Sequence, residues 1–547
     1  MANASRSRVS LFRRGQVMPP APVAEPEDRS LLPLTETLKE SVAVDLNGAG
    51  ATAYVSRDLA SNPHLLTWVK SNKDRGIQVD IRIVEVDEIG DLRSRYAGGR
   101  KEDVDLELTN RNLGMDLLRK AGDYLASDMH IRINGDYGEV QIVVKGELRV
   151  LDKLTHKAGE ALIRALYQGI AATKSDSLKP TEFQNAQIPG HVFGSEGGIT
   201  SIRLVRGPCY PMAEGGQFMT LRLQYQTGPA SAESSEERKK LPSLPFPKPP
   251  AGEFQLQTLG YTPTQIEKLE MLLSAPSGLI LFTGPTGSGK TTTLYECLAE
   301  MARRRPWDRQ VTAEDPVEYP MEWGVQLGFT DSGSDTEAGA AYLEAVRVML
   351  RMAPKVMLIG EIRGGKVASA AFNAAITGHL ALSTLHVDDP YLFVERLEFM
   401  DRGQLHRDVF CDPKIIRGVI AQRLLPRLCP KCRIRLKDAP GELPERIVTA
   451  LETWGSTSRV ALRGPGCSHC AGDGTLGRTA IAEVVVMDDV LAADFIEHGT
   501  AAARANYRKR PDADPSMLDS AIAHALAGEI DPRAIEKNID LILPRTR

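Results

Sequence analysis

The sequence predicts an α/β fold, a mostly parallel sheet with helices on both faces, preceded by an α+β domain. From residue 253 onward, short apolar runs such as GLILFTG, KVMLIGE and LALSTLH alternate with helix-prone stretches such as KTTTLYECLAEMARR and KVASAAFNAAITG. This alternation is typical of parallel strands joined by crossover helices. Residues 101–226 differ, because a helical stretch is followed there by runs in which apolar and polar residues alternate. Two of these runs flank residues 134–138 (NGDYG), which predict a hairpin.

The domain boundaries follow from length and local composition. A chain of 547 residues, at about 150 residues per domain, predicts three or four domains. Residues 15–45 are rich in Pro, Glu and Ala, and residues 227–253 are rich in Ser, Pro, Lys and Glu, which predicts two unstructured segments. The predicted segments are a disordered tail (1–45), a small N-terminal region of unknown role (46–100), the α+β domain (101–226), a linker (227–252), the α/β core (253–428), a cysteine module (429–480) and a C-terminal helical region (481–547).

Composition and charge exclude several classes of protein. The chain is 42% apolar and 25% charged, as ordinary globular proteins are. Its 67 Lys and Arg nearly balance its 71 Asp and Glu, so the net charge of −4 argues against a general nucleic-acid coat, although a local basic channel stays possible. No apolar run approaches the roughly 18 residues that span a bilayer. The first fourteen residues carry four arginines, but no apolar stretch follows them, so we expect no secretory signal and a cytoplasmic location.

A glycine-rich loop follows the apolar run GLILF and precedes a helix-prone stretch. The segment GPTGSGKT, Gly284 to Thr291, fits the pattern G-x-x-x-x-G-K-[ST]. Its glycines let backbone N–H groups turn toward phosphate oxygens, Lys290 supplies a positive charge, and the Thr291 hydroxyl can ligate Mg²⁺. A chance match is the alternative, and the strand–loop–helix context disfavours it. The predicted nucleotide-binding residues are Gly284, Pro285, Thr286, Gly287, Ser288, Gly289, Lys290, Thr291 and Thr292.

Acidic side chains stand at the ends of two neighbouring apolar runs. KVMLIGE ends in Glu361, and RQVTAED presents Glu314 with Asp315 close behind. Open α/β sheets carry their functional groups outside the carboxyl ends of the strands. An acid there is costly unless a cation lies opposite, and bound Mg²⁺ with ATP would supply one. The alternative is that both acids are simply solvated.

Two histidines bracket the run LALSTL, and they are candidates for sensing the γ-phosphate. These are His379 and His386. A histidine at a strand end is otherwise most often a structural residue.

Four of the seven cysteines form two C-x-x-C pairs separated by 34 residues. In a reducing compartment this spacing indicates metal ligation, because each pair makes a tight turn that points two thiolates at one ion. Four reduced core cysteines, or a redox pair, are the alternatives. The predicted zinc ligands are Cys429, Cys432, Cys467 and Cys470, which would form a zinc-binding insertion.

Five motifs together resemble the secretion ATPase superfamily of type II secretion and type IV pilus motors. They are GPTGSGKTTTLY, TAEDPVEY, VMLIGEIR, TGHLALSTLH and AQRLLPRLCPKC, and the resemblance covers about residues 105–495. It implies a homohexameric ring whose protomers pair an N-terminal domain with a RecA-like ATPase domain and bind ATP between them. It further implies an inner-membrane platform protein as partner, peripheral membrane association, no nucleic acid, and the cofactors ATP, Mg²⁺ and Zn²⁺.

The resemblance also assigns roles to residues. It implies that Glu314 and Glu361 share metal positioning and water activation, without apportioning the two roles, and that His379 and His386 belong to the family's His box. ASDMHIR and GELR resemble segments of the family's N-terminal domain, in which arginines reach ATP across the domain interface. The matching positions here are Arg203 and Arg222, and the alternative is that both are solvated strand-surface residues.

This chain departs from the family's pattern at several places, which indicates an outlying branch. Ala353-Pro354-Lys355 replaces Asp-Pro-Asp, Gly364 replaces an Asp, Val387-Asp388 replaces Thr-Asn, and Gly215-Gly216-Gln217 replaces Gly-Glu-Arg. The resemblance also implies an assembly or export motor rather than a retraction motor, because such a cysteine module is typical of the former in this family. A nucleic-acid-translocating motor with the same core, and a metal-binding scaffold switched by ATP, are the competing hypotheses.

Overall fold

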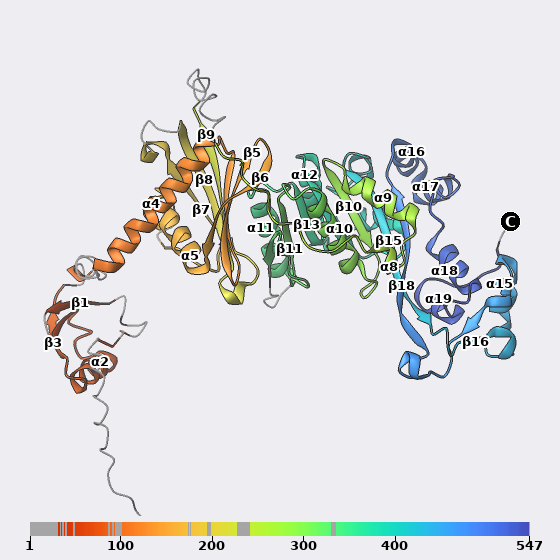
Figure 1. The fold of residues 1–547 in the computed structure, drawn as a ribbon, viewed down its shortest axis with the longest axis horizontal. Coiled ribbons are helices and arrows are strands. Elements are labelled where there is room, and N and C mark those ends of the chain that lie inside the picture. Colours follow the sequence, from red (N-terminus) through yellow and green to blue (C-terminus); the bar gives the residue numbers. More distant parts are fainter. Residues whose placement is uncertain are drawn as a thin grey trace, which may run out of the picture. The chain divides into compact units, whose positions relative to one another are not determined.

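The computed structural model (Figure 1) describes residues 31, 32, 34, 38, 41–47, 50–85, 88, 89, 92, 101–172, 174, 177–193, 198–226, 241–329 and 335–545. The chain divides into two compact units between Leu108 and Thr109. Most of the predicted tail, residues 1–45, lies outside the described residues. Among the described residues, no helix is both long enough and apolar enough to cross a membrane.

The first unit contains a small three-stranded sheet with a helix. Strand β2 pairs antiparallel with β1 and parallel with β3, and helix α2 connects β2 to β3. The helix begins after Asn62, whose side chain accepts the backbone N–H of His64, and Pro63 occupies its first position. The side chains of Leu65 and Trp68 are buried in the core. The elements are β1 (Val42–Asn47), β2 (Gly50–Val55), α2 (Pro63–Asp74) and β3 (Gln78–Ile83).

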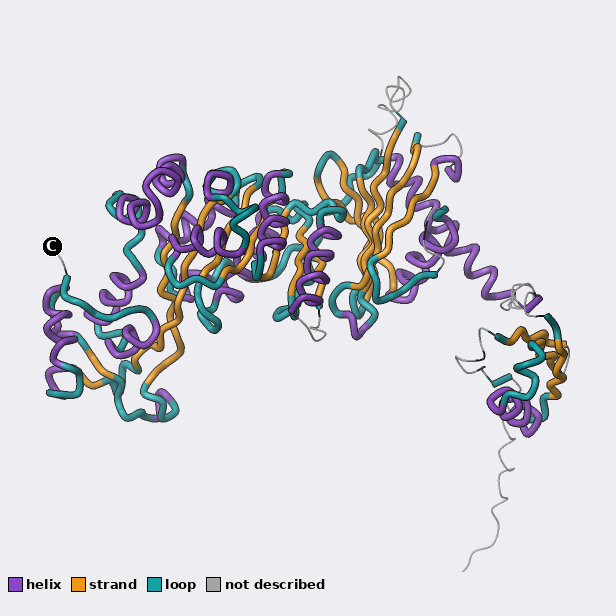
Figure 2. The backbone as a smooth tube through the Cα atoms, turned by 180° about the vertical axis from the view of Figure 1, so that it is seen from behind, coloured by secondary structure: helices purple, strands orange, loops and turns teal. Residues whose placement is uncertain are grey.

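An α+β domain opens the second unit, as the sequence predicts. Its six strands form an antiparallel sheet in the order β6-β5-β4-β9-β8-β7, with helices α4 and α5 packed on one face (Figure 2). The predicted hairpin is β4–β5, whose turn is closed by the Asn134 side chain accepting the N–H of Tyr137 at 2.8 Å. Helix α4 begins before the boundary between the two units, and its residues from Thr109 onward belong to this domain. The elements are α4 (Lys101–Asp123), β4 (Asp128–Ile133), β5 (Tyr137–Val144), β6 (Glu147–Thr155), α5 (His156–Arg164), β7 (Gln184–Pro189), β8 (Ile199–Pro208) and β9 (Gln217–Tyr225).

The core domain is an α/β sheet of seven strands in the order β12-β11-β13-β14-β10-β15-β18. All neighbouring strands are parallel except β18, which pairs antiparallel with β15, so the predicted fold class is confirmed. Every residue of β10 is buried, as a strand covered on both faces requires. The core strands are β10 (Gly278–Thr283), β11 (Gln310–Glu314), β12 (Val325–Gly328), β13 (Val356–Glu361), β14 (Leu380–Leu385), β15 (Ile416–Leu428) and β18 (Thr475–Val486).

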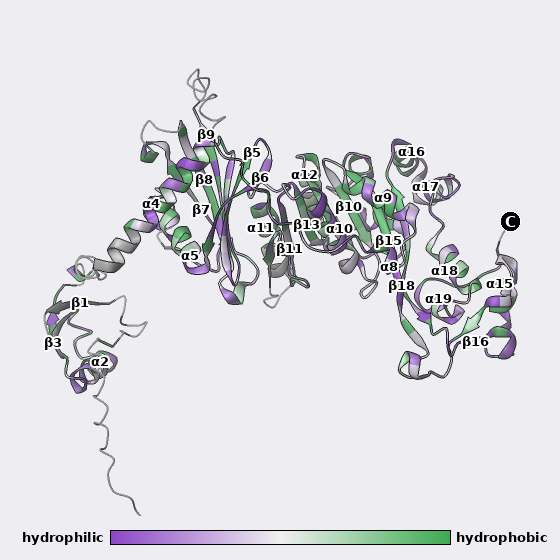
Figure 3. Cartoon of the chain, viewed as in Figure 1, coloured by the Kyte–Doolittle hydropathy of each residue, from purple (hydrophilic) through white to green (hydrophobic). Residues whose placement is uncertain are grey.

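Helices cover both faces of the core sheet. The strands of this sheet are accordingly rich in hydrophobic residues, which are green in Figure 3. Alternate residues of β10 enter two different cores: Leu279 and Leu281 pack with α11 and α12, and Ile280 and Phe282 pack with α9 and α10. The helices are α9 (Pro263–Leu273), α10 (Lys290–Arg304), α11 (Asp335–Met349), α12 (Gly365–Ile376) and α13 (Phe393–Met400).

The cysteine pairs lie between β15 and β18, the two longest strands of the core sheet. Cys429 follows β15 directly, and Cys470 precedes β18 by a short turn. Between them, helix α15 (Glu445–Trp454) shares one apolar core with α18 (Met517–Leu526) and α19 (Pro532–Asn538). The cysteine module and the C-terminal helices are therefore packed together rather than independent.

The second half of the predicted linker is packed against the protein. Residues 227–240 lie outside the described residues, but the Val150 N–H of β6 donates to the Pro245 carbonyl at 2.9 Å. The Arg149 guanidinium lies 3.7 Å from the centroid of the Phe246 ring, and that ring lies 5.2 Å from Trp307 of the core domain. This segment therefore bridges the α+β domain and the core domain.

Candidate active site

The phosphate-binding loop leaves β10 and enters α10, as the sequence predicts. Gly284, Gly287 and Gly289 have φ values of 141°, 78° and 82°, which L side chains rarely adopt. A Cβ at Gly284 would lie 2.5 Å from the carbonyl oxygen of Gln422, and a Cβ at Gly289 would lie 2.8 Å from the side-chain nitrogen of the same residue. The glycines therefore serve both the turn and the close approach of β15.

Gln422 holds this loop from the neighbouring strand. Its side-chain nitrogen donates to the Ser288 carbonyl at 2.9 Å. Its side-chain oxygen accepts from the hydroxyls of Tyr261 at 2.6 Å and Thr293 at 2.8 Å. Gln422 thus makes three hydrogen bonds inside the protein, and the one to Ser288 fixes the loop against β15.

The loop offers donors suited to phosphate oxygens. The Lys290 ammonium donates to the carbonyls of Gly284 and Pro285 at 2.7 and 2.9 Å, and it is 8% exposed. Burial lowers the pKa of Lys290 to about 8, although the nearby Glu361 opposes this shift. The Ser288 hydroxyl is buried and has no hydrogen-bond partner among the described residues. These donors at the N-terminus of α10 fit a phosphate chain.

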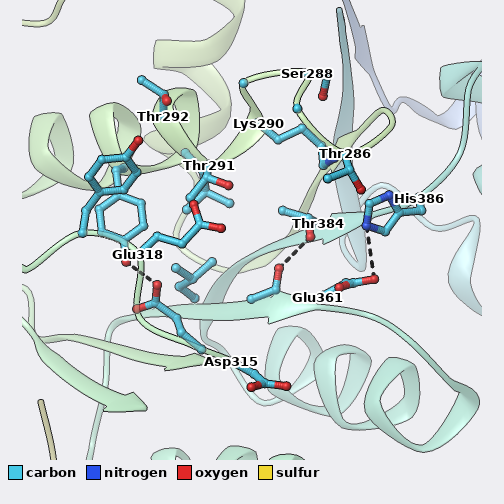
Figure 4. A pocket seen from close by; sticks show the side chains of 18 of the residues that line it. Thr286, Ser288, Lys290, Thr291, Thr292, Asp315, Glu318, Glu361, Thr384 and His386 are labelled. Atoms are coloured by element: carbon cyan, nitrogen blue, oxygen red, sulfur yellow. Dashed lines mark hydrogen bonds and ion pairs between the residues drawn. The ribbon is translucent and has the colours of Figure 1, made fainter. Parts of the chain in front are cut away.

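The loop opens into a pocket of about 840 Å³ at the carboxyl ends of the strands (Figure 4). Of the nine predicted nucleotide-binding residues, the seven from Thr286 to Thr292 line it, while Gly284 and Pro285 supply the carbonyls that hold Lys290. Both predicted acids line it as well. The other walls include Tyr295, Asp315, Glu318, Tyr319, Tyr342, Thr384, His386, Leu424 and Arg478.

Glu361 faces the pocket from the end of β13. One carboxylate oxygen lies 3.3 Å from Nε2 of His386, and the other accepts from Nε of Arg363 at 2.9 Å (Figure 4 shows the first contact). Arg363 also lies 3.4 Å from Asp315. The carboxylate is thus oriented by two groups but keeps access to the cavity.

Glu314, at the end of β11, is enclosed by donors from the protein itself. It is 5% exposed and accepts hydrogen bonds from the Tyr295 hydroxyl, the Thr312 hydroxyl at 2.5 Å and the Gln326 side chain at 3.1 Å. Burial raises its pKa, and these hydrogen bonds oppose that shift. The two acids therefore lie in different environments, although in the sequence both stand at the end of an apolar run.

The structure separates the two predicted histidines. His386 lies just beyond the carboxyl end of β14 and lines the pocket. His379 lies before the amino end of the same strand, where its carbonyl accepts the N–H of Gly278 at 3.0 Å. A strand of six residues separates them, which amounts to about 20 Å at the usual rise per residue. Of these two histidines, His386 lines the pocket of its own chain and His379 does not.

Arg203 and Arg222 are directly opposed on β8 and β9, and neither lines the pocket. Arg203 is exposed, and the half-exposed Arg222 side chain pairs with Asp128 at 2.9 Å. Like charges directly opposed across a sheet are unfavourable without an anion. In this chain Asp128 supplies a negative charge next to Arg222 but not next to Arg203.

Several residues of the site are not predicted by the sequence. Gln422 stands in the motif AQRLLPRL, but its contact with the loop depends on β15 lying beside β10. Arg478 reaches the pocket from β18, and Tyr342 reaches it from α11. Arg478 in GRTAIAE and Tyr342 in AAYLEAV stand in segments that carry no local signal of this role.

The four cysteines converge on one point, as the spacing predicts. Their Sγ atoms all lie within 4.8 Å of one another, and three of the pairs are 3.8 Å apart. Four thiolates about 2.3 Å from a zinc ion in tetrahedral geometry would be about 3.8 Å apart. The N–H groups of Cys467 and Gly474 also point at the Cys470 sulfur, at 3.2 and 3.1 Å. The cluster thus fits a closed zinc site.

Comparisons with known proteins agree with these motifs. Residues 246–536 match the family described as "Type II/IV secretion system protein". The "Protein transport protein HofB homolog" of Escherichia coli is 32% identical over 68% of this chain and 69% of its own length. The "Type II secretion system protein E" of Klebsiella pneumoniae is 36% identical over 43% and 44%, and the "Type IV pilus assembly ATPase PilB" of Thermus thermophilus is 34% identical over 43% and 25%. This chain thus spans less than half the length of the latter two.

Among solved structures, the pilus retraction motor PilT with bound ADP aligns with 77% of this chain and 96% of its own, at 20% identity and a TM-score of 0.37. The resemblance drawn from the five motifs is confirmed by the family match, which covers more than half of the sequence. The chain therefore belongs to the type II/IV secretion system protein family.

Proposed function

We propose that this chain is the ATPase motor that powers assembly of a type IV pilus or of a type II secretion pseudopilus at the inner membrane. The observation that carries the proposal is the phosphate-binding loop opening onto a pocket whose far side presents Glu361 beside His386. The enzyme is an ATPase that converts ATP to ADP and phosphate. Its family and the names of its relatives support this reaction class.

Binding of ATP uses the loop and the start of α10. Lys290 exchanges the two loop carbonyls that it now contacts for β- and γ-phosphate oxygens. Backbone N–H groups of residues 286–292 cradle the phosphates. The Thr291 hydroxyl would hold Mg²⁺, which neutralises phosphate charge when bound.

Glu361 and Glu314 have different roles in water activation and metal positioning. Glu361 keeps access to the pocket, so it orients the attacking water and accepts its proton. Glu314 already accepts three hydrogen bonds, so it instead fixes the strand end and would help to position Mg²⁺ when the ion is bound. His386, next to Glu361, contacts the γ-phosphate and thereby senses whether ATP or ADP is bound.

Arg203 and Arg222 act on ATP only in the assembled motor. Because neither lines the pocket of its own chain, they reach a nucleotide after domain rotation or in a neighbouring protomer of a homohexamer. An anion between the two opposed guanidinium groups removes their repulsion. His379, outside the pocket, belongs to the same contact between protomers.

The remaining parts serve stability and attachment. Cys429, Cys432, Cys467 and Cys470 would hold a structural Zn²⁺, because four thiolates leave no position open for water. The motor is cytoplasmic and attaches peripherally through a platform protein, assisted by the basic first fourteen residues. The domain boundaries predicted from the sequence remain part of the proposal.

Measurement of multiple-turnover ATP hydrolysis tests the proposal, with and without single-stranded DNA and with Lys290→Ala as the inactive control. We expect turnover by the unaltered chain that DNA does not change. Strong stimulation by DNA would favour the nucleic-acid motor, and nucleotide binding without any turnover would favour a metal-binding scaffold that ATP merely switches.

A further inference from the structure

The backbone is irregular at the end of β13, directly before Glu361. Ile359 is paired with Ser383 of β14, but Glu361 is paired with the next residue, Thr384, so Gly360 is an extra residue without a partner. Such a bulge re-aims the side chain that follows it, and it leaves local backbone groups in need of other partners. The Gly360 carbonyl finds one in the Thr384 hydroxyl at 2.7 Å.

The N–H of Glu361 finds its partner in a side chain from another element. It donates to the hydroxyl of Tyr342, on helix α11, at 3.1 Å. The same hydroxyl donates its proton to the Ala313 carbonyl at 3.0 Å. Because a hydroxyl has one proton, these two bonds fix both of its roles: it accepts from Glu361 and donates to Ala313.

This hydroxyl connects the two strand ends that carry the predicted acids. Ala313 immediately precedes Glu314 on β11, and Glu361 ends β13. The two strands are paired only as far as Ala313 and Ile359, so beyond that point the Tyr342 hydroxyl continues the connection. The ring is held by Phe329, whose centroid lies 6.1 Å away, and burial raises the pKa of Tyr342, which keeps its proton in place.

We propose that Tyr342 is a positioning residue for hydrolysis: its hydroxyl holds the bulge that aims Glu361 into the pocket, in register with Glu314. The inference rests on the proposed ATPase function. Tyr342 acts through Glu361 rather than on ATP, so its hydroxyl contributes to the rate of the chemical step and not to nucleotide affinity. Misplacing a reacting group by about 1 Å can cost roughly 100-fold in rate.

The test compares Tyr342→Phe with Tyr507→Phe. The Tyr507 hydroxyl also accepts a backbone N–H, that of Val486 at 3.0 Å, but Tyr507 does not line the pocket. Both variants therefore lose a hydroxyl that accepts one backbone N–H. We expect Tyr342→Phe to lower kcat by about 10- to 100-fold with the Kd for ATP changed less than about twofold. Tyr507→Phe should leave kcat near that of the unaltered chain.

Amide hydrogen exchange of the segment around Glu361 provides a readout that does not require turnover. Exchange there should be faster in Tyr342→Phe and unchanged in Tyr507→Phe. An unaltered kcat in Tyr342→Phe, an equal loss in both variants, or unchanged exchange at Glu361 would each overturn the inference. An unaltered chain that binds ATP without hydrolysing it would instead refute the proposed function, and the exchange experiment would still decide whether the hydroxyl holds the bulge.

Discussion

Nε2 of His386 lies 3.3 Å from a carboxylate oxygen of Glu361, across the ends of the neighbouring strands β14 and β13. The His386 side chain is 40% exposed and the Glu361 side chain 26%, so both are accessible from the pocket. Opposite them, Lys290 stands at the start of α10 (Figure 4). A terminal phosphate on Lys290 would therefore meet a histidine and a carboxylate that already contact each other.

Substitution of Lys290 and of Glu361 should separate binding from hydrolysis. Lys290→Ala removes the loop's positive charge, so we expect nucleotide binding and turnover to be lost together. Glu361→Gln keeps the shape of the side chain but cannot accept a proton, so ATP should still bind while turnover falls by roughly 100-fold or more. Binding titrations and steady-state rates on both variants measure this difference. Equal loss of affinity in the two would contradict the division of roles.

The affinity for ATP should fall at high pH. Burial lowers the pKa of Lys290 to about 8 in the free chain, and bound phosphate would raise it. Below pH 8 the ammonium is already charged and the affinity should not depend on this group. Above pH 8 binding must take up a proton, so the association constant should decrease by up to about tenfold per pH unit. Calorimetry at pH 9 in buffers of different ionisation enthalpy measures the uptake, and affinity that stays constant from pH 7 to 10 would contradict the expectation.

The purified protein should contain one zinc ion per chain. Cys432→Ser should release it and unfold the segment between β15 and β18, since thiolate ligation contributes about 10 kcal/mol or more. Helices α18 and α19 share the core of that segment, so they should lose protection as well, while ATP affinity changes little. Elemental analysis and hydrogen exchange measure both effects. Cys411→Ala, a buried cysteine outside the cluster, is the control that should retain zinc, and protein purified without chelator yet free of zinc would refute the site.

Replacing Arg309 by Met should leave the protein equally stable or more stable. Arg309 is 4% exposed, and its Nε and Nη1 have no hydrogen-bond partner within the described part of the chain. Burial, together with the adjacent Arg132, lowers its pKa, and the nearby Asp128 only partly opposes this shift. Exchanging a poorly compensated buried charge for an apolar side chain is often neutral or stabilising by about 1–4 kcal/mol.

The control for this substitution is Arg508→Met. Arg508 pairs with the buried carboxylate of Glu483 at 2.8 Å, so its loss leaves that carboxylate uncompensated and should cost about 3–5 kcal/mol. Urea unfolding of both variants gives the comparison. If Arg309→Met is as destabilising as the control, the attraction between Arg309 and the nearby Asp128 outweighs the cost of burying the guanidinium group.

Local sequence was sufficient for the fold class and for the parts of the site that lie within one segment. The loop from Gly284 to Thr291 is defined by its own glycines between a buried strand and a helix, and both cysteine pairs are defined by their spacing. In each case the interactions concern residues a few positions apart, so periodicity and motif identify them.

The tertiary structure alone decided which acid remains open to the pocket and which histidine reaches it. Glu314 is enclosed by Tyr295 and Gln326, and Gln422 reaches the loop from 134 positions beyond Ser288. His379 and His386 look equivalent along the chain, yet they stand at opposite ends of β14. The physical reason is that crossover helices bring distant strand ends to one edge of the sheet. The order of the strands, which no local pattern encodes, determines which side chains meet there.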